Sequence, residues 1–204
     1  MNPLFHDDFS ISDSLKFVRK SVLIYETIIE NRGQVLFDRQ DRILGTLIES
    51  QKDKSKSQMK TLIQTILPSI ALYKCLSEEM TEDEAYEYMK RYMFDKVGAE
   101  MHSSMEKMEM VPGFFAIYSS IFRKIMRTSD LHESTQASGK GYFDINITKC
   151  LWHIACVENG CANLCRLFCD ADHVTYGGLK KIDFTRTKTL GYGEDCCDFH
   201  YFKK

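Results

Sequence analysis

The hydrophobic positions of the first 128 residues recur at helical spacing. The first such set consists of Leu15, Val18, Val22, Tyr25 and Ile29. Intervals of three and four residues place apolar side chains on one face of a helix. The set begins after Ser12-Asp13 and ends before Gly33, residues that are typical of helix starts and stops. We therefore predict a first amphipathic helix over this stretch.

Further apolar stripes predict helices around 36–48, 62–73, 81–92 and 114–125, about five in all. The polar stretch 51–58 predicts a segment that connects two helices. Pro68 should kink the third helix unless it lies near an end. Thr81 and Glu84 have the spacing of a capping box, and Pro112-Gly113 separate the last two helices.

From Thr128 to Gly141 most residues are polar or small, which favours a loop joining two halves of the chain. After it the period changes to two, with Phe143, Ile145 and Ile147 alternating against polar residues, so we predict a strand. A helix over 161–174 with Gly177-Gly178 as its stop should follow. Two more strands are expected, over 182–186 and 197–201, with a hairpin turn at 191–193.

These elements predict an α+β fold: an N-terminal helical half packed on a C-terminal small antiparallel sheet with one cysteine-rich helix. We expect a single domain over residues 1–204, in which 1–128 form the helical half and 142–204 the cysteine-rich α/β half. A hydrophobic content of 44% is sufficient for a substantial core.

Charge and hydropathy narrow the class of protein. The chain carries 27 Lys and Arg against 29 Asp and Glu, so its overall charge does not favour nucleic acid as a partner. The first ten residues include Asp7 and Asp8 and lack the apolar core of a signal peptide. No apolar run reaches the roughly 18 residues of a membrane span. We expect a cytoplasmic protein that does not bind membranes, in which the cysteines are reduced.

Chemically competent side chains are concentrated in the last quarter of the chain. Seven of the eight cysteines lie between Cys150 and Cys197, interleaved with Asp170, Asp172, His173, Arg186 and Asp198. The function should be sought in this segment.

Three runs in this segment carry a family resemblance: 169–173 (CDADH), 184–190 (FTRTKTL) and 193–201 (GEDCCDFHY), with Cys150 in the run 148–151 (TKCL). Together they resemble the L-2-amino-thiazoline-4-carboxylic acid hydrolase family over about the last 60 residues. The resemblance implies opening of a thiazoline ring by water, on a route toward cysteine through a carbamoyl-cysteine.

Attack of water on an amidine carbon needs a base, a proton donor and an anchor for the substrate carboxylate. Asp172 and His173 lie three and four residues after Cys169, so all three can converge on one helix. We predict a catalytic group with Cys169 as nucleophile or acid and Asp172 as base. Alternatively, water is the nucleophile throughout and Cys169 only packs. Arg186 should bind the substrate carboxylate, since its guanidinium can form a bidentate pair.

On the last strand, alternation places Cys197 with Phe199 and Tyr201 on one face and Asp198 with His200 on the other. We retain Cys197 as a catalytic candidate and Asp198 as a group that could hold the substrate amidinium. Cys150 is a further substrate-binding candidate, because Cys150, Cys169 and Cys197 come from different elements and could converge.

No cofactor is expected. The less favoured alternative is a zinc-type metal on cysteines, because the four-residue spacing of Cys161, Cys165 and Cys169 is more typical of core positions than of zinc ligands. The expected partner is a small-molecule substrate, and a homodimer is left open.

A second hypothesis is a small-molecule-binding or sensor module without catalysis. The strand from Gly193 to Phe199, after a helical half, also resembles 4-vinyl-reductase-type ligand-binding domains. An enzyme predicts Asp172 and Arg186 directed into one cavity, whereas a binding module permits both to lie outside an apolar one.

Overall fold

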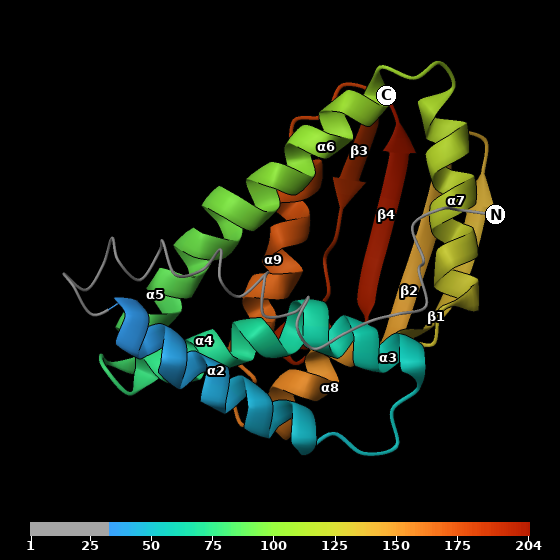
Figure 1. Ribbon diagram of the computed structural model, residues 1–204. Coiled ribbons are helices and arrows are strands. Elements are labelled where there is room, and N and C mark those ends of the chain that lie inside the picture. Colours follow the sequence, from blue (N-terminus) through green and yellow to red (C-terminus); the bar gives the residue numbers. More distant parts are fainter. Residues whose placement is uncertain (1–32) are drawn as a thin grey trace. The chain divides into compact units, whose positions relative to one another are not determined.

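The computed structural model describes residues 33–204 (Figure 1). The helix expected over Leu15–Ile29 lies outside the described residues. The described residues fall into two compact units, the first ending at Ala85 and the second comprising Tyr86–Lys204. Most of the helices precede an antiparallel sheet, so the α+β fold predicted from the sequence is confirmed.

The described part of the first unit is helical. It contains α2 (Gly33–Glu49), α3 (Lys56–Thr61), a π-helical turn (Leu62–Ile66), α4 (Leu67–Ser77) and the start of α5 (Glu82–Tyr92). The helix predicted around 36–48 is confirmed by α2, which buries Leu36, Leu44 and Leu47. α2 packs on α4, and the buried Gln40 donates a hydrogen bond to the carbonyl oxygen of Pro68.

Pro68 lies in the first turn of α4, directly after the π-helical turn. The run 56–77 is helical without a break, so Pro68 lies inside it, and the wider π-helical turn before Pro68 accommodates the ring. Pro68 is therefore not near a helix end, and the helical irregularity that accompanies it is the π-helical turn Leu62–Ile66.

The predicted capping box at the start of α5 is confirmed. The Glu84 amide donates to Thr81 Oγ1 at 3.3 Å, and the Thr81 amide donates to Glu84 Oε2 at 3.0 Å. A second box at Ser55 and Gln58 opens α3 inside the stretch that was expected to be a connection. The reciprocal bonds satisfy amides that the first helical turn leaves without partners.

The second unit continues α5 into a π-helical turn (Met93–Gly98), α6 (Ala99–Glu109) and α7 (Phe114–Thr128). Gly113 separates the last two with a left-handed φ of 72°, as the Pro112-Gly113 break predicted. The remaining elements are β1 (His132–Gly139), β2 (Tyr142–Cys150), α8 (Leu151–Glu158), α9 (Leu164–Tyr176), β3 (Ile182–Thr185), a 3₁₀ turn (Leu190–Tyr192) and β4 (Cys197–Lys203).

The loop predicted over 128–141 is wrong, because most of it forms strand β1. Its residues are polar, so the strand is specified by pairing with β2 along its whole length rather than by apolar alternation. The inward-facing Ser134 and Gln136 donate hydrogen bonds to carbonyl oxygens of α7. Tertiary contacts therefore stabilise a strand that the sequence pattern does not indicate.

Helix α8 was also not predicted. It begins directly after β2 and buries Leu151, Ala155 and Cys156. A helix of eight residues that is apolar on most sides has no amphipathic period to reveal it. α9 begins at Leu164, so Cys161 precedes the helix in which it was placed.

The sheet is antiparallel in the order β1-β2-β4-β3. α7 and α9 cover the same face of the sheet, because Tyr118 of α7 and Tyr176 of α9 both pack against Tyr201 of β4. The core includes Phe143, Ile145 and Ile147 of β2 and Cys197, Phe199 and Tyr201 of β4. The alternation predicted for both strands is confirmed, and it fixes which thiol, Cys197 or Cys196, faces the helices.

Candidate functional site

Arg186 directly follows β3, and its side chain contacts three residues of α9. Its Nη1 donates to the carbonyl oxygen of Cys169 at 2.8 Å and lies 3.4 Å from Asp172 Oδ2, and its Nη2 lies 3.3 Å from Asp170 Oδ1. The Arg186 side chain is only 4% exposed. A guanidinium held by two carboxylates and a carbonyl has a fixed orientation, and it fixes the carboxylates in turn.

Asp172 is a carboxyl group that can exchange protons near neutral pH. Burial raises the pKa of Asp172 to about 7, with smaller raising effects from Cys197 and Asp170, while the Arg186 charge lowers it. The side chain nevertheless keeps 29% of its surface exposed. Asp172 is therefore largely surrounded by protein atoms but remains accessible to water, as a general base requires.

Cys169 and Cys197 are brought together from α9 and β4 through Thr189. The Thr189 hydroxyl lies 3.0 Å from Cys169 Sγ and 3.3 Å from Cys197 Sγ, and the Leu190 amide lies 3.3 Å from Cys197 Sγ. Gly191 makes this approach possible, because a Cβ there would lie 2.9 Å from Cys169 Sγ.

Both thiols are protonated at neutral pH. The neighbouring Cys165 thiol and burial raise the pKa of Cys169 to about 12, against lowering by Cys197 and Thr189. The Cys169 thiol and burial raise the pKa of Cys197 further still. These groups are suited to donating a proton or a hydrogen bond rather than to existing as thiolates.

Cys150 occupies the N-cap position of α8 at the end of β2. Burial raises the pKa of Cys150 to about 11, the amides of His153 and Trp152 oppose this, and the charges of Cys197 and Asp172 add to it. Cys150 thus lies within electrostatic range of Cys197 and Asp172. The structure therefore brings Cys150, Cys169, Asp172, Arg186 and Cys197 to one region of the second unit.

His173 does not join this group. It is exposed on α9 with its ring against Phe184 at a centroid distance of 5.3 Å. Burial and the Arg186 charge lower the pKa of His173.

Asp198 lies on the face of β4 opposite Cys197 and Tyr201. It accepts hydrogen bonds from the amides of Thr187 and Lys188 at 2.9 and 2.6 Å and from the Thr187 hydroxyl at 2.5 Å. Burial acts to raise the pKa of Asp198, but these hydrogen bonds together lower it. The carboxylate holds the segment after β3 against β4.

Sequence reasoning named Asp170 without giving it a role and missed Thr189, Tyr118, Tyr176 and Tyr201. Asp170 and Tyr176 had a local signal, because they lie on the same helix as Asp172. The others reach the region from separate elements.

Within residues 33–204 no three His, Cys, Asp or Glu side chains gather as a metal site would require. No helix in this part of the chain is both long and apolar enough to cross a membrane.

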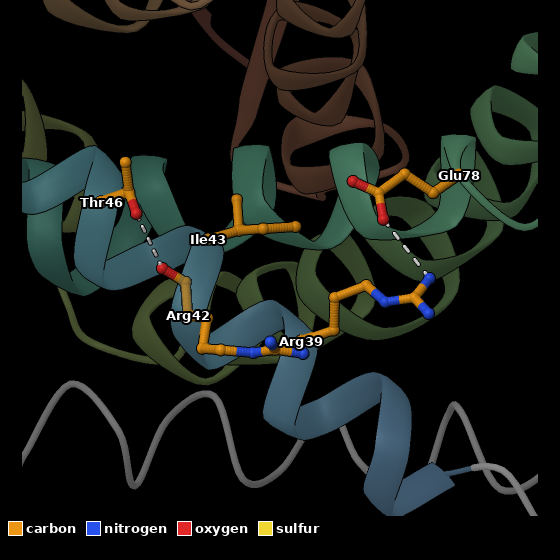
Figure 2. Close-up of a pocket in the computed structure, with 5 residues that line it drawn as sticks. All are labelled: Arg39, Arg42, Ile43, Thr46 and Glu78. Carbon is orange, nitrogen blue, oxygen red and sulfur yellow. Dashed lines mark hydrogen bonds and ion pairs between the residues drawn. The ribbon is translucent and has the colours of Figure 1, made fainter.

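A hollow on the surface of the first unit is lined by Arg39, Arg42, Ile43, Thr46 and Glu78 (Figure 2). Arg39 Nη1 lies 3.4 Å from Glu78 Oε2, and the Thr46 hydroxyl donates to the carbonyl oxygen of Arg42 at 3.2 Å. This hollow contains none of the predicted site residues.

Comparison with known families identifies the chain. The sequence model of the L-2-amino-thiazoline-4-carboxylic acid hydrolase family matches residues 58–201. The protein belongs to this family. The match covers most of the chain and includes α4 to β4, so it extends well beyond the C-terminal motifs that carried the resemblance. No curated protein matches the sequence.

Proposed function

We propose that this hydrolase-family protein opens the ring of L-2-amino-thiazoline-4-carboxylate or a related cyclic amidine to a carbamoyl-cysteine-type product. The observation that carries the proposal is Asp172, an accessible carboxyl group held 3.4 Å from Arg186 Nη1, with a pKa raised to about 7. A base poised near the working pH is what activation of water demands. The family membership supports the substrate class.

In the proposed reaction, ionised Asp172 accepts a proton from water as the oxygen bonds to the ring carbon between sulfur and nitrogen. The C=N electron pair moves to nitrogen, giving a tetrahedral adduct. The proton of the added hydroxyl passes to that nitrogen, and the adduct collapses to a C=O group with cleavage of one ring bond, from the carbon to sulfur or to nitrogen. The proton held by Asp172 passes to the departing atom, so that one water is added overall.

The raised pKa values of the thiols favour water as the nucleophile. Cys150 and Cys169, with pKa values of about 11 and 12, are protonated at neutral pH, so either could relay this proton by donating its own to the departing atom and recovering the one held by Asp172. A Cys169 or Cys197 thiolate would first have to lose its proton against burial. We therefore propose proton donation as the role of the thiols.

Arg186 has two roles to be distinguished. Its contacts with Asp170 and Asp172 support a role in orienting the base. Binding of the substrate carboxylate remains our prediction from sequence, as does binding of the amidinium by Asp198. Lack of any cofactor or metal also stays a prediction, together with the single domain, the cytoplasmic location and the possible homodimer.

The test is incubation of purified, metal-analysed protein with L-2-amino-thiazoline-4-carboxylate, with carbamoyl-cysteine followed by mass spectrometry. Free thiol measured on the same samples identifies the bond, because only cleavage of the carbon–sulfur bond releases a thiol. Asp172→Asn should lower kcat by about 10²- to 10⁴-fold. Asp183→Asn, which changes an exposed carboxyl group of the same unit, is the control.

Cys169→Ala and Cys150→Ala separate the roles of the thiols. Loss of turnover in one of them would identify the proton donor. Full turnover in both would mean that neither thiol is needed and that Asp172 and water carry out the proton transfers. Lack of product from folded wild-type protein would withdraw this substrate. The ligand-binding module would then be the leading hypothesis.

A further inference from the structure

Asp170 shares the Arg186 guanidinium with Asp172. Asp170 Oδ1 lies 3.3 Å from Arg186 Nη2, whereas Asp172 Oδ2 lies 3.4 Å from Arg186 Nη1. Residues two positions apart on a helix do not face each other, so it is the Arg186 side chain that joins the two carboxyl groups. Each of them binds a different nitrogen of one guanidinium.

The second oxygen of Asp170 binds Tyr192. Tyr192 ends the 3₁₀ turn Leu190–Tyr192, and its hydroxyl donates to Asp170 Oδ2 at 2.6 Å. The hydrogen bond to Asp170, together with burial and the Asp170 charge, raises the pKa of Tyr192 to about 12, so the phenol remains the donor. Asp170 therefore accepts a hydrogen bond on each oxygen, which stabilises the ionised form of a carboxyl group.

Two contacts hold the turn that carries Tyr192 against α9. The Arg166 guanidinium lies 5.0 Å from the centroid of the Tyr192 ring, a cation–π contact. A Cβ at Gly191 would lie 3.3 Å from the Arg166 amide nitrogen, so glycine allows a close approach of the turn to the helix backbone. Tyr192 is thus fixed beside Asp170 although its side chain is about half exposed.

The buried Arg186 side chain needs a negative charge that persists at neutral pH. It is only 4% exposed, and its guanidinium is always protonated. A buried charge without a partner is strongly destabilising. Asp172 cannot supply the balancing charge at all times, because a pKa of about 7 leaves it protonated in part of the molecules. Asp170 can supply it, since both of its hydrogen bonds favour the ionised form.

The other titratable groups around Asp172 do not supply this charge. Burial and neighbouring groups raise the pKa values of the thiols and phenols there, so these are neutral at neutral pH: Cys150, Cys197, Tyr118, Tyr176 and Tyr201. The lowered pKa of His173 makes it neutral as well. In the part of the chain that the structure describes, the printed ion pairs of Arg186 are those with Asp170 and Asp172.

We propose that Asp170, held in place by Tyr192, is the permanent counter-charge of Arg186 and leaves Asp172 free to take up and release the proton of the attacking water. Asp170 is then a positioning residue, which acts through Arg186 and does not touch the substrate. This inference deepens the proposed function and rests on it for the role of Asp172 as base.

Loss of the Asp170 charge has a defined consequence. Asp172 would become the counter-charge of Arg186, so its ionised form would be favoured and its pKa would fall. A carboxylate with a lower pKa is a weaker base toward water, so turnover would fall as well.

The experiment titrates the Asp172 carboxyl carbon by ¹³C NMR in wild type and in Asp170→Asn. The signal is identified by its absence from spectra of Asp172→Asn. Asparagine keeps the size of the side chain and can still accept a hydrogen bond from Tyr192. We expect a midpoint near pH 7 in wild type and a midpoint lower by about one pH unit or more in Asp170→Asn. Asp183→Asn, at an exposed carboxyl group of the same unit, should match wild type.

Tyr192→Phe separates the charge of Asp170 from its orientation. This variant removes the hydrogen bond of the Tyr192 hydroxyl but keeps the Asp170 charge, so the midpoint should move less than in Asp170→Asn. An unchanged or higher midpoint in Asp170→Asn would overturn the inference. An equal shift in the two variants would do the same, because loss of charge would not be its cause.

Kinetics with L-2-amino-thiazoline-4-carboxylate connect the titration to the reaction. In Asp170→Asn, the rise of kcat should move to lower pH together with the NMR midpoint, and the plateau of kcat should fall several-fold. KM should stay within about 2-fold of wild type, because Asp170 does not touch the substrate. A raised KM with unchanged kcat would overturn the positioning role.

The two measurements also separate this inference from the proposed function. If folded wild-type protein does not hydrolyse the thiazoline, the proposed function fails. The NMR titration still decides whether Asp170 balances the charge of Arg186, since it requires no substrate.

Discussion

Asp172 carries a carboxyl group whose protonation should control activity and stability together. Its pKa rises from 3.8 in the unfolded chain to about 7 in the folded protein, chiefly through burial. The folded state therefore binds this proton more tightly between about pH 4 and pH 7. The contribution of Asp172 to stability is greatest below this range and is lost as pH rises through 7.

We predict that kcat increases with pH through about 7 as Asp172 ionises. The free energy of unfolding of wild type should fall relative to Asp172→Asn between pH 5 and pH 8. Initial rates across this range and urea denaturation of both proteins measure the two effects. Parallel stability profiles, or a rate independent of pH around 7, would contradict the assignment.

Replacement of Arg186 tests which of its two roles matters. Its charge lowers the pKa of Asp172, so Arg186→Gln should move the rise in kcat to higher pH by about one unit or more. If Arg186 also binds the substrate carboxylate, Arg186→Lys should raise KM about 10-fold or more, because lysine lacks the bidentate fork. An unchanged KM would leave Arg186 with orientation of Asp172 only.

Among the helices, we predict that the capping box of α5 contributes to the stability of the protein. Thr81→Ala removes the acceptor for the Glu84 amide, so the free energy of unfolding should fall by about 0.5–2 kcal/mol. Ser57→Ala, an exposed change within α3 that touches neither box, is the control. Equal urea midpoints for the two variants would show that the box adds nothing.

Two helical glycines should respond in opposite directions to alanine. A Cβ at Gly98 would lie 2.9 Å from Val174 Cγ1 and 3.2 Å from the Met93 carbonyl oxygen, so the π-helical turn could not pack as closely on α9. Gly98→Ala should destabilise the protein by about 1 kcal/mol. Gly45→Ala in α2 meets nothing within 4 Å and should stabilise by about 0.5–1 kcal/mol. Tm values of the two variants check both signs.

For the whole molecule, we predict that the thiols are reduced but slow to react. All eight cysteines are free, and six of them are buried; Cys150 and Cys169 are partly exposed. Without added reductant, a thiol reagent should react with all eight cysteines after denaturation and with few of them in the native protein. Rapid native reaction of most thiols, or fewer than eight after denaturation, would disagree with the structure.

Local pattern alone was sufficient for the elements whose side chains alternate between core and solvent. The helical stripe of α2, the Thr81–Glu84 box and the period-two alternation of β2 and β4 each lie within a few neighbouring residues. The physical cause is that burial of one face imposes a period on the sequence. The α+β class follows from the order of these segments.

The tertiary structure alone decided the features that depend on residues distant in the chain. β1 is a strand because β2 pairs with it and α7 accepts its hydrogen bonds. Arg186 contacts Asp170 and Asp172 because β3 ends beside α9. Tyr118, Tyr176 and Tyr201 meet from α7, α9 and β4. Burial, which raises the pKa of Asp172, arises only when these segments pack, so the sequence determined which groups were available and the fold determined their chemistry.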